Sequence, residues 1–215
     1  MSSITLALVQ IKCYTNYMEK EKFYIFLDID GTLYTQQDIR ERTPAGFPMY
    51  ISEDFWPQNC NAESRDAFNK IIDTLEQKYD TEVVIVSRKR KDMQMCEHYL
   101  KEVYKLHISK PLQKTPYIDG ERSDKIINYI ENDCGLYPKT RNIIKNLLNR
   151  KKLTTNYVII DDDTFAKDMR TTLLSNIFGE ENYIHVHGKR SSLRMSQADE
   201  FLKSKDLVPE DLLPN

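Results

Sequence analysis

The sequence predicts an α/β fold in which a central parallel sheet is flanked by helices on both faces. Three short apolar runs, at residues 23–27, 83–86 and 157–160, are rich in β-branched and aromatic side chains and end in polar residues. Runs of this kind are typical of strands that are buried on both faces of a parallel sheet. Between the first two runs, apolar side chains recur every three or four residues over 61–79, which indicates an amphipathic helix. A strand, a helix and a second strand in this order form the unit from which parallel sheets are built.

The first apolar run ends in the motif Asp28-Ile29-Asp30-Gly31-Thr32. Alternate residues of a strand point to the same side, so Asp28 and Asp30 share a side if the strand continues through them. Two carboxylates at the end of a buried strand repel each other and lose solvation, and a hard cation would offset both costs. Mg²⁺ is such a cation, because it binds one or two carboxylates together with water and phosphate oxygens. The alternative is a solvated strand end with an Asp-Gly turn, but a plain turn does not need the first acid.

The other elements follow in order. Asn61 is placed to cap the first helix, and the run at 83–86 continues the sheet up to Ser87. Apolar spacing predicts a second helix over residues 93–104, and residues 104–108 are predicted to form a short strand. Later segments of the same scheme are helices from about residue 123 and from residue 138, strands at 156–160 and 183–187, and a closing helix through residues 201 and 202.

A second chemical signal lies at Ser87, where the second strand ends. Open α/β sheets bind ligands at the carboxyl ends of their strands, and a hydroxyl with the following amides can donate to phosphate oxygens. The basic run 88–91 comes directly afterwards. It is either a solvated helix start or, because cations are disfavoured at that end of a helix, a sign of an anionic ligand nearby. Lys125, in the first turn of the next helix, has the same two interpretations, and Arg122 is its competitor.

The strand at 156–160 repeats the design of the first, since it ends in Asp161, Asp162 and Asp163. Three adjacent carboxylates repel strongly unless a cation or basic neighbours lie among them. Successive side chains at a strand end diverge, so we expect one or two of the three to reach a shared metal.

Residues 34–59 contain several backbone breakers and are predicted to form a long loop. Loops of this length are uncommon in compact domains unless they are functional or pack on themselves. Four aromatic residues of this segment either grip a substrate beside the site or form a small satellite core. They are Phe47, Tyr50, Phe55 and Trp56.

Length and composition bound the organisation of the chain. Its 215 residues suffice for one domain, which we place at residues 23–205, with an N-terminal segment at 1–22 and a linker-like tail at 206–215. The net charge of −2 creates no global attraction to nucleic acid or to an anionic membrane, and no apolar run approaches the length of a membrane span. The basic segment 139–152 is more typical of a solvated face than of a nucleic-acid contact. Four scattered cysteines without a CxxC pair favour a reducing, cytoplasmic compartment.

Four motifs now stand in a fixed order: DxDGT at Asp28, Ser87, a lysine at a helix start and the acids after residue 160. In this order they resemble the haloacid dehalogenase (HAD) superfamily over residues 23 to about 188, which implies its Rossmann-like fold. Thr115-Pro116, Gly120-Glu121-Arg122 and the strand before the acids look like the HAD domain of Swiss-army-knife RNA-repair proteins. Capless HAD phosphatases that act on phosphoproteins are similar in architecture.

The resemblance implies a catalytic role for each acid. Asp28 would be the nucleophile that forms an aspartyl-phosphate, and Asp30 the general acid and base. Mg²⁺ would be bound by Asp28, the backbone carbonyl of Asp30 and an acid of the last motif. That motif lacks the Gly-Asp start common in the family, which leaves both Asp161 and Asp162 open as the metal ligand. An acid at the second position of DxD also favours phosphatase over dehalogenase chemistry, in which no leaving oxygen needs a proton.

The resemblance also implies which residues hold the phosphate. Thr32, Ser87 and either Lys125 or Arg122 would bind its oxygens, whose charge must be stabilised during transfer.

The substrate class is inferred from the short segments between the motifs, none of which is long enough for a large cap domain. Capless members of the family tend to act on macromolecules, so the expected partner is a macromolecular phosphate, with protein favoured over nucleic acid. Phosphotyrosine is the favoured substrate, because the loop aromatics could flank its ring. The rival is a terminal phosphate of RNA or DNA, removed by a 3′-phosphatase, and a third reading is a non-catalytic phosphopeptide-binding module. The intact acids of DxDGT disfavour that third reading.

Overall fold

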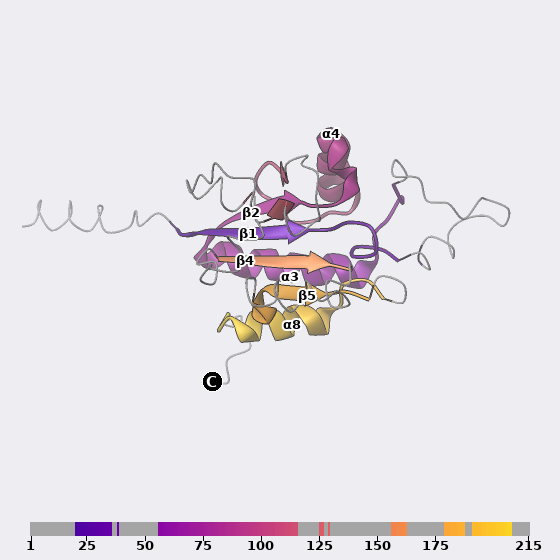
Figure 1. Cartoon of the computed structure of the whole chain (residues 1–215). Helices are drawn as coiled ribbons and strands as arrows, with labels where there is room; N and C mark the ends of the chain where they lie inside the picture. The colour runs from indigo at the N-terminus through magenta and orange to yellow at the C-terminus, as the bar shows by residue number, and fades with distance from the viewer. Residues whose placement is uncertain are drawn as a thin grey trace, which may run out of the picture.

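A central sheet of five parallel strands organises the described part of the chain (Figure 1). The computed structural model describes residues 20–35, 38, 56–115, 125, 126, 129, 156–162, 179–187 and 191–207. The strands are β1 (Lys22–Leu27), β2 (Asp80–Ile85), β3 (Gln113–Lys114), β4 (Asn156–Asp161) and β5 (Tyr183–His185), in the spatial order β3-β2-β1-β4-β5. The first strand in sequence therefore lies at the centre and pairs with both β2 and β4. The α/β fold with a central parallel sheet is confirmed.

Side chains of β1 alternate between two hydrophobic cores, one on each face of the sheet. Phe23, Ile25 and Leu27 belong to the larger core, to which α3 (Ala62–Lys78) and α8 (Met195–Ser204) also contribute. Tyr24 and Phe26 belong to the smaller core, which contains the helical residue Ile126. Helical residues therefore pack on both faces, and β1 has no solvated face, which is why its sequence is an unbroken apolar run.

The helix predicted after Asn61 is α3, which lies along the sheet in Figure 1. Asn61 is its N-cap, since its Oδ1 accepts the backbone N–H groups of Glu63 at 3.0 Å and Ser64 at 3.3 Å. The apolar residues predicted to share one face are buried: Phe68, Ile71, Ile72 and Leu75. α3 packs against α8 and the sheet, and so closes the larger core.

Short helical segments connect β2 to the edge of the sheet. They are η1 (Arg88–Lys91), α4 (Met93–Glu97) and η2 (His98–Val103), and η4 (Glu180–Asn182) precedes β5. The predicted helix over residues 93–104 is thus present as α4 and η2, and η2 has the wider π-type winding.

The prediction of a strand at residues 104–108 is wrong. Its apolar residues are buried and alternate with exposed ones, which is the pattern that predicted a strand. However, Lys105 has a φ of 58°, a left-handed conformation that ends helices. The N–H groups of Tyr104 and Leu106 donate to carbonyls of the preceding helical turn instead of to a neighbouring strand. The sheet continues at β3, whose two residues are both exposed.

Leu207 is buried in the larger core, so packing continues just beyond residue 205. Residues 1–19 and 208–215 lie outside the described residues, and the proposed domain boundaries stay predictions. Among the described helices, none has the length and apolarity required to cross a membrane. Cys60 and Cys96 are buried free thiols.

Candidate active site

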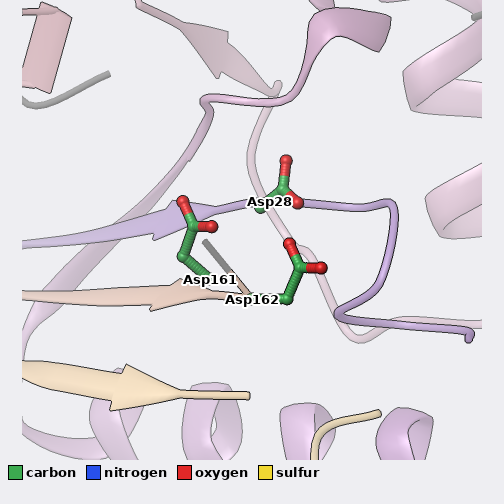
Figure 2. Close-up of side chains that lie close together, drawn as sticks. All are labelled: Asp28, Asp161 and Asp162. Carbon is green, nitrogen blue, oxygen red and sulfur yellow. The ribbon is translucent and has the colours of Figure 1, made fainter. Parts of the chain in front are cut away.

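Three carboxylates meet at the carboxyl edge of the sheet (Figure 2). Asp28 follows β1, Asp161 is the last residue of β4, and Asp162 comes next. One oxygen of each lies within 4.8 Å of an oxygen of the others. Asp161 is fully buried, Asp28 is 2% exposed and Asp162 is half-buried. The sheet therefore brings together acids that are more than a hundred residues apart in sequence.

Strand pairing sets the position of these acids. Leu27 of β1 is the register partner of Ile160 of β4, so the next residues, Asp28 and Asp161, end neighbouring strands. The N–H of Asp28 donates to the carbonyl of Ile160 at 3.0 Å, and the N–H of Val86 donates to the carbonyl of Leu27 at 3.0 Å. The backbone just before and at Asp28 is thus held from both sides.

Gly31 allows the turn after Asp30 to pass close to the acids. Its φ is +83°, which glycine adopts without steric cost, and a Cβ atom there would lie 2.1 Å from Oδ2 of Asp162. The turn is closed by hydrogen bonds from the Gly31 N–H to the Tyr34 carbonyl and from the Leu33 N–H to the Ile29 carbonyl, both 3.0 Å.

The three acids fit a hard divalent cation. Mg²⁺ takes oxygen ligands, and carboxylates this close together repel one another unless positive charge lies among them. Both Asp161 and Asp162 reach the cluster, so which of the two would bind the metal stays a prediction. Asp163 lies outside the described residues. The Asp30 side chain is not part of the cluster; the predicted metal contact of Asp30 is its backbone carbonyl.

The Asp30 carboxylate is partly exposed and is contacted by three side chains. The Tyr34 hydroxyl donates to Oδ1 at 2.6 Å, the Ser87 hydroxyl donates to Oδ2 at 3.3 Å, and Nζ of Lys89 lies 3.5 Å from Oδ1. Burial, followed by the charge of Asp30, raises the pKa of Tyr34 far above its usual value, so the phenol stays protonated and donates. The predicted general acid is therefore oriented from the turn on one side and from η1 on the other.

Sequence reasoning missed Lys89. Lys89 lies in the basic run 88–91, which could have been a solvated helix start. Only Arg88 and Lys91 fit that interpretation, because they are exposed. Lys89 and Arg90 are buried, and Arg90 donates to the carbonyls of Val86 and Ser87 at 3.1 and 2.9 Å. The unfavourable position of cations at a helix start was the only signal, and it could not single out one of the four residues.

The predicted phosphate ligands occupy different depths. Ser87 is buried beside Asp30, and Thr32 is fully buried, with no hydrogen-bond partner for its hydroxyl among the described residues. Lys125 is helical and half-buried, next to Ile126 of the smaller core. Arg122 lies outside the described residues.

Trp56 packs within the larger core. It is 9% exposed, and its ring stacks on Tyr99 with the centroids 4.7 Å apart and an angle of 15° between the planes. Lys89 Nζ lies 4.6 Å from the centre of the same ring. The loop aromatics were expected either to grip a substrate or to form a small core. Trp56 packs in a core, and Phe47, Tyr50 and Phe55 lie outside the described residues.

A parallel Rossmann-like sheet whose central strand ends in DxDGT, with further acids at the end of a neighbouring strand, defines a HAD-type domain. The family of the HAD domain in Swiss Army Knife RNA repair proteins matches residues 24–190, and the chain belongs to it. The superfamily and its RNA-repair branch, both expected from the motifs, are thereby confirmed. No curated protein and no solved structure gives a significant match to the chain.

Proposed function

We propose that this protein is a Mg²⁺-dependent phosphomonoesterase that removes a terminal phosphate from a nucleic acid. The observation that carries the proposal is the cluster of Asp28, Asp161 and Asp162 at the sheet edge, with Asp30 held two residues after Asp28. Hydrolase chemistry of the phosphatase type follows from the family, and the RNA-repair branch of that family favours a nucleic-acid substrate.

In the proposed reaction, Asp28 is the nucleophile and Asp30 carries the proton. An oxygen of Asp28 attacks phosphorus, the bond from phosphorus to the ester oxygen breaks, and Asp30 gives its proton to that oxygen. Asp30 then takes a proton from water, whose oxygen attacks the same phosphorus; the bond from phosphorus to the Asp28 oxygen breaks, and inorganic phosphate leaves. The Asp28 carboxylate is regenerated in this second step. The arrangement requires Asp30 to keep one orientation, which its contacts with Tyr34 and Ser87 support.

The metal would be held by Asp28 and by Asp161, Asp162 or both, with the Asp30 carbonyl as a further ligand. Bound there, Mg²⁺ supplies positive charge that screens the repulsion between carboxylate and phosphate. Thr32, Ser87 and a cation, Lys125 or Arg122, are the proposed ligands of the phosphate oxygens. The buried hydroxyl of Thr32 supports this assignment, because a buried polar group without a partner is costly unless a ligand or water satisfies it.

Protein phosphotyrosine, favoured by the sequence alone, has less support. That preference depended on aromatic side chains that could flank a substrate ring, and Trp56 packs in the core with Tyr99 stacked on it. A phosphopeptide-binding module without catalysis is disfavoured by the complete set of acids. A reducing, cytoplasmic location and a macromolecular partner remain proposals.

The test is phosphate release with Mg²⁺ from a 3′-phosphorylated oligonucleotide, a phosphotyrosine peptide and a phosphoserine peptide. We expect the oligonucleotide to be the best substrate and Asp28→Asn to abolish release while the circular dichroism spectrum is unchanged. Preference for phosphotyrosine would replace the nucleic-acid proposal with a protein phosphatase. Undiminished turnover by Asp28→Asn would remove the nucleophile, and no turnover of any of the three would contradict the phosphatase proposal.

A further inference from the structure

Lys89 places a buried cation beside the predicted general acid. Its Nζ lies 3.5 Å from Oδ1 of Asp30, and its side chain is only 1% exposed. Lysine is almost never buried to this degree unless its charge is paired, because the ammonium group loses its hydration. Asp30 is 43% exposed, so this ion pair joins a buried cation to an acid that substrate can reach.

Trp56 and the backbone of η1 hold the lysine in place. The ammonium lies 4.6 Å from the centre of the Trp56 ring, which is within the range of a cation–π interaction. The backbone N–H of Lys89 donates to the Ser87 hydroxyl at 3.4 Å, and its carbonyl accepts the N–H of Asp92 at 3.1 Å. The thiol of Cys96 donates to the same carbonyl at 3.3 Å. Both ends of the residue are therefore fixed before a substrate arrives.

The position of Lys89 puts its charge within reach of a phosphate group. An ester oxygen that takes a proton from Asp30 must approach that carboxylate to about 2.6–3.2 Å. Since Lys89 Nζ lies 3.5 Å from Oδ1 of the same carboxylate, a phosphoryl group that approaches Asp30 from that side would come close to the ammonium as well. A cation that is already desolvated and oriented stabilises phosphoryl charge without further reorganisation.

We propose that Lys89 is a phosphate-binding residue of the active site, which pairs with Asp30 before substrate binds and with a phosphoryl oxygen afterwards. The inference rests on the proposed phosphatase function for the identity of the ligand. Within the basic run the inference applies to Lys89 alone. Arg88 and Lys91 are exposed, and the Arg90 guanidinium donates to the carbonyls of Val86 and Ser87 instead.

The experiment measures Mg²⁺-dependent binding of beryllium fluoride, a small mimic of the phosphoryl group on an aspartate, by calorimetry with the full chain. A hydrogen bond to a charged group accounts for about 10- to 100-fold in affinity, so Lys89→Met should weaken binding by that factor. Lys89→Arg should restore part of the loss, and Mg²⁺ affinity should not change. Lys91→Met is the matched control, since it removes a charge from the same turn at an exposed position and should bind as the wild type does.

Tryptophan fluorescence gives a second, independent measurement. Trp56 is the only tryptophan of the chain, and the Lys89 ammonium lies over its ring. Addition of beryllium fluoride with Mg²⁺ should change its emission as the ammonium moves toward the ligand, and Lys89→Met should lose the change.

Wild-type affinity for beryllium fluoride in Lys89→Met, or no binding and no emission change in the wild-type protein, would overturn the inference. The two proposals fail separately. Turnover of a phosphate ester together with Lys89-independent binding leaves the phosphatase and removes Lys89. Lys89-dependent binding without turnover of any phosphate ester supports the site and removes the proposed function.

Discussion

Gly31 combines two requirements that a side chain cannot meet together. Its φ of +83° costs an L-residue about 1–2 kcal/mol, and its missing Cβ leaves space for the Asp162 carboxylate. We expect Gly31→Ala to displace this carboxylate and to lose most of its activity and Mg²⁺ affinity. Metal affinity is measured by calorimetry and stability by urea denaturation.

Gly179→Ala is the control for backbone strain. Gly179 also has a positive φ, +73°, but it precedes η4 and β5, whereas Gly31 follows β1. A Cβ atom at Gly179 would meet the exposed Glu181 side chain. It should lose about as much stability as Gly31→Ala and keep its metal affinity. Equal metal affinity in both glycine variants would show that Gly31 matters for its conformation alone.

Single residues differ in how far sequence could predict their place in the site. The positions of Asp28 and Asp161 were predictable, because an acid at the end of a buried apolar strand costs free energy unless a cation lies nearby. The proposed role of Lys89 was not predictable, because it depends on a buried ring, Trp56, from the segment before α3 and on an acid from the turn after β1. Neither contact leaves a periodic trace in the sequence.

The N-terminus of α3 is joined to the turn that follows DxDGT. Asn61 caps the helix through Oδ1, and its Nδ2 donates to Asp38 at 3.2 Å; Asp38 in turn accepts the N–H and hydroxyl of Thr35. Loss of an N-cap costs about 0.5–2 kcal/mol, so we expect Asn61→Ala to lower the free energy of unfolding by that amount in urea denaturation. Asn61→Ser keeps a capping oxygen and should lose less. If the alanine and serine variants were equally stable, the cap would not be what Asn61 contributes.

At the level of elements, β1, β2, β4 and α3 were predicted because their burial on both faces or on one helical face dictates their composition. β3 could not be found, since its two exposed residues, Gln113 and Lys114, carry no apolar signal. The false strand at 104–108 shows the limit of the same argument. Alternating burial is necessary for a strand with one buried face, but a chain that leaves a helix across a core can produce it without any partner strand.

For the molecule as a whole, the acid cluster predicts that metal binding and folding are coupled. A cation that binds only the folded protein stabilises it, by about 2.7 kcal/mol when its concentration is a hundred times the dissociation constant. We expect Mg²⁺ to raise the melting temperature of the wild-type protein relative to buffer with a chelator. Asp161→Asn should lose this increase, because Asp161 is the fully buried carboxylate of the cluster.

Asp73→Asn serves as the control, since Asp73 is exposed on α3, where it pairs with His107 away from the cluster. It should keep the full Mg²⁺-dependent increase. A rise of equal size in both aspartate variants would mean that Mg²⁺ stabilises the protein elsewhere.

The pairing of β1 with β4 has a consequence for how such sites arise in evolution. Neighbouring parallel strands are about 4.8 Å apart in every sheet, a spacing that suits two carboxylates sharing one divalent ion. Asp28 and Asp161 obtain their separation from this general spacing and not from any special loop. In an ancestral sheet, two substitutions at the ends of adjacent strands would place a pair of carboxylates at this separation, and natural selection could then refine the turns around them.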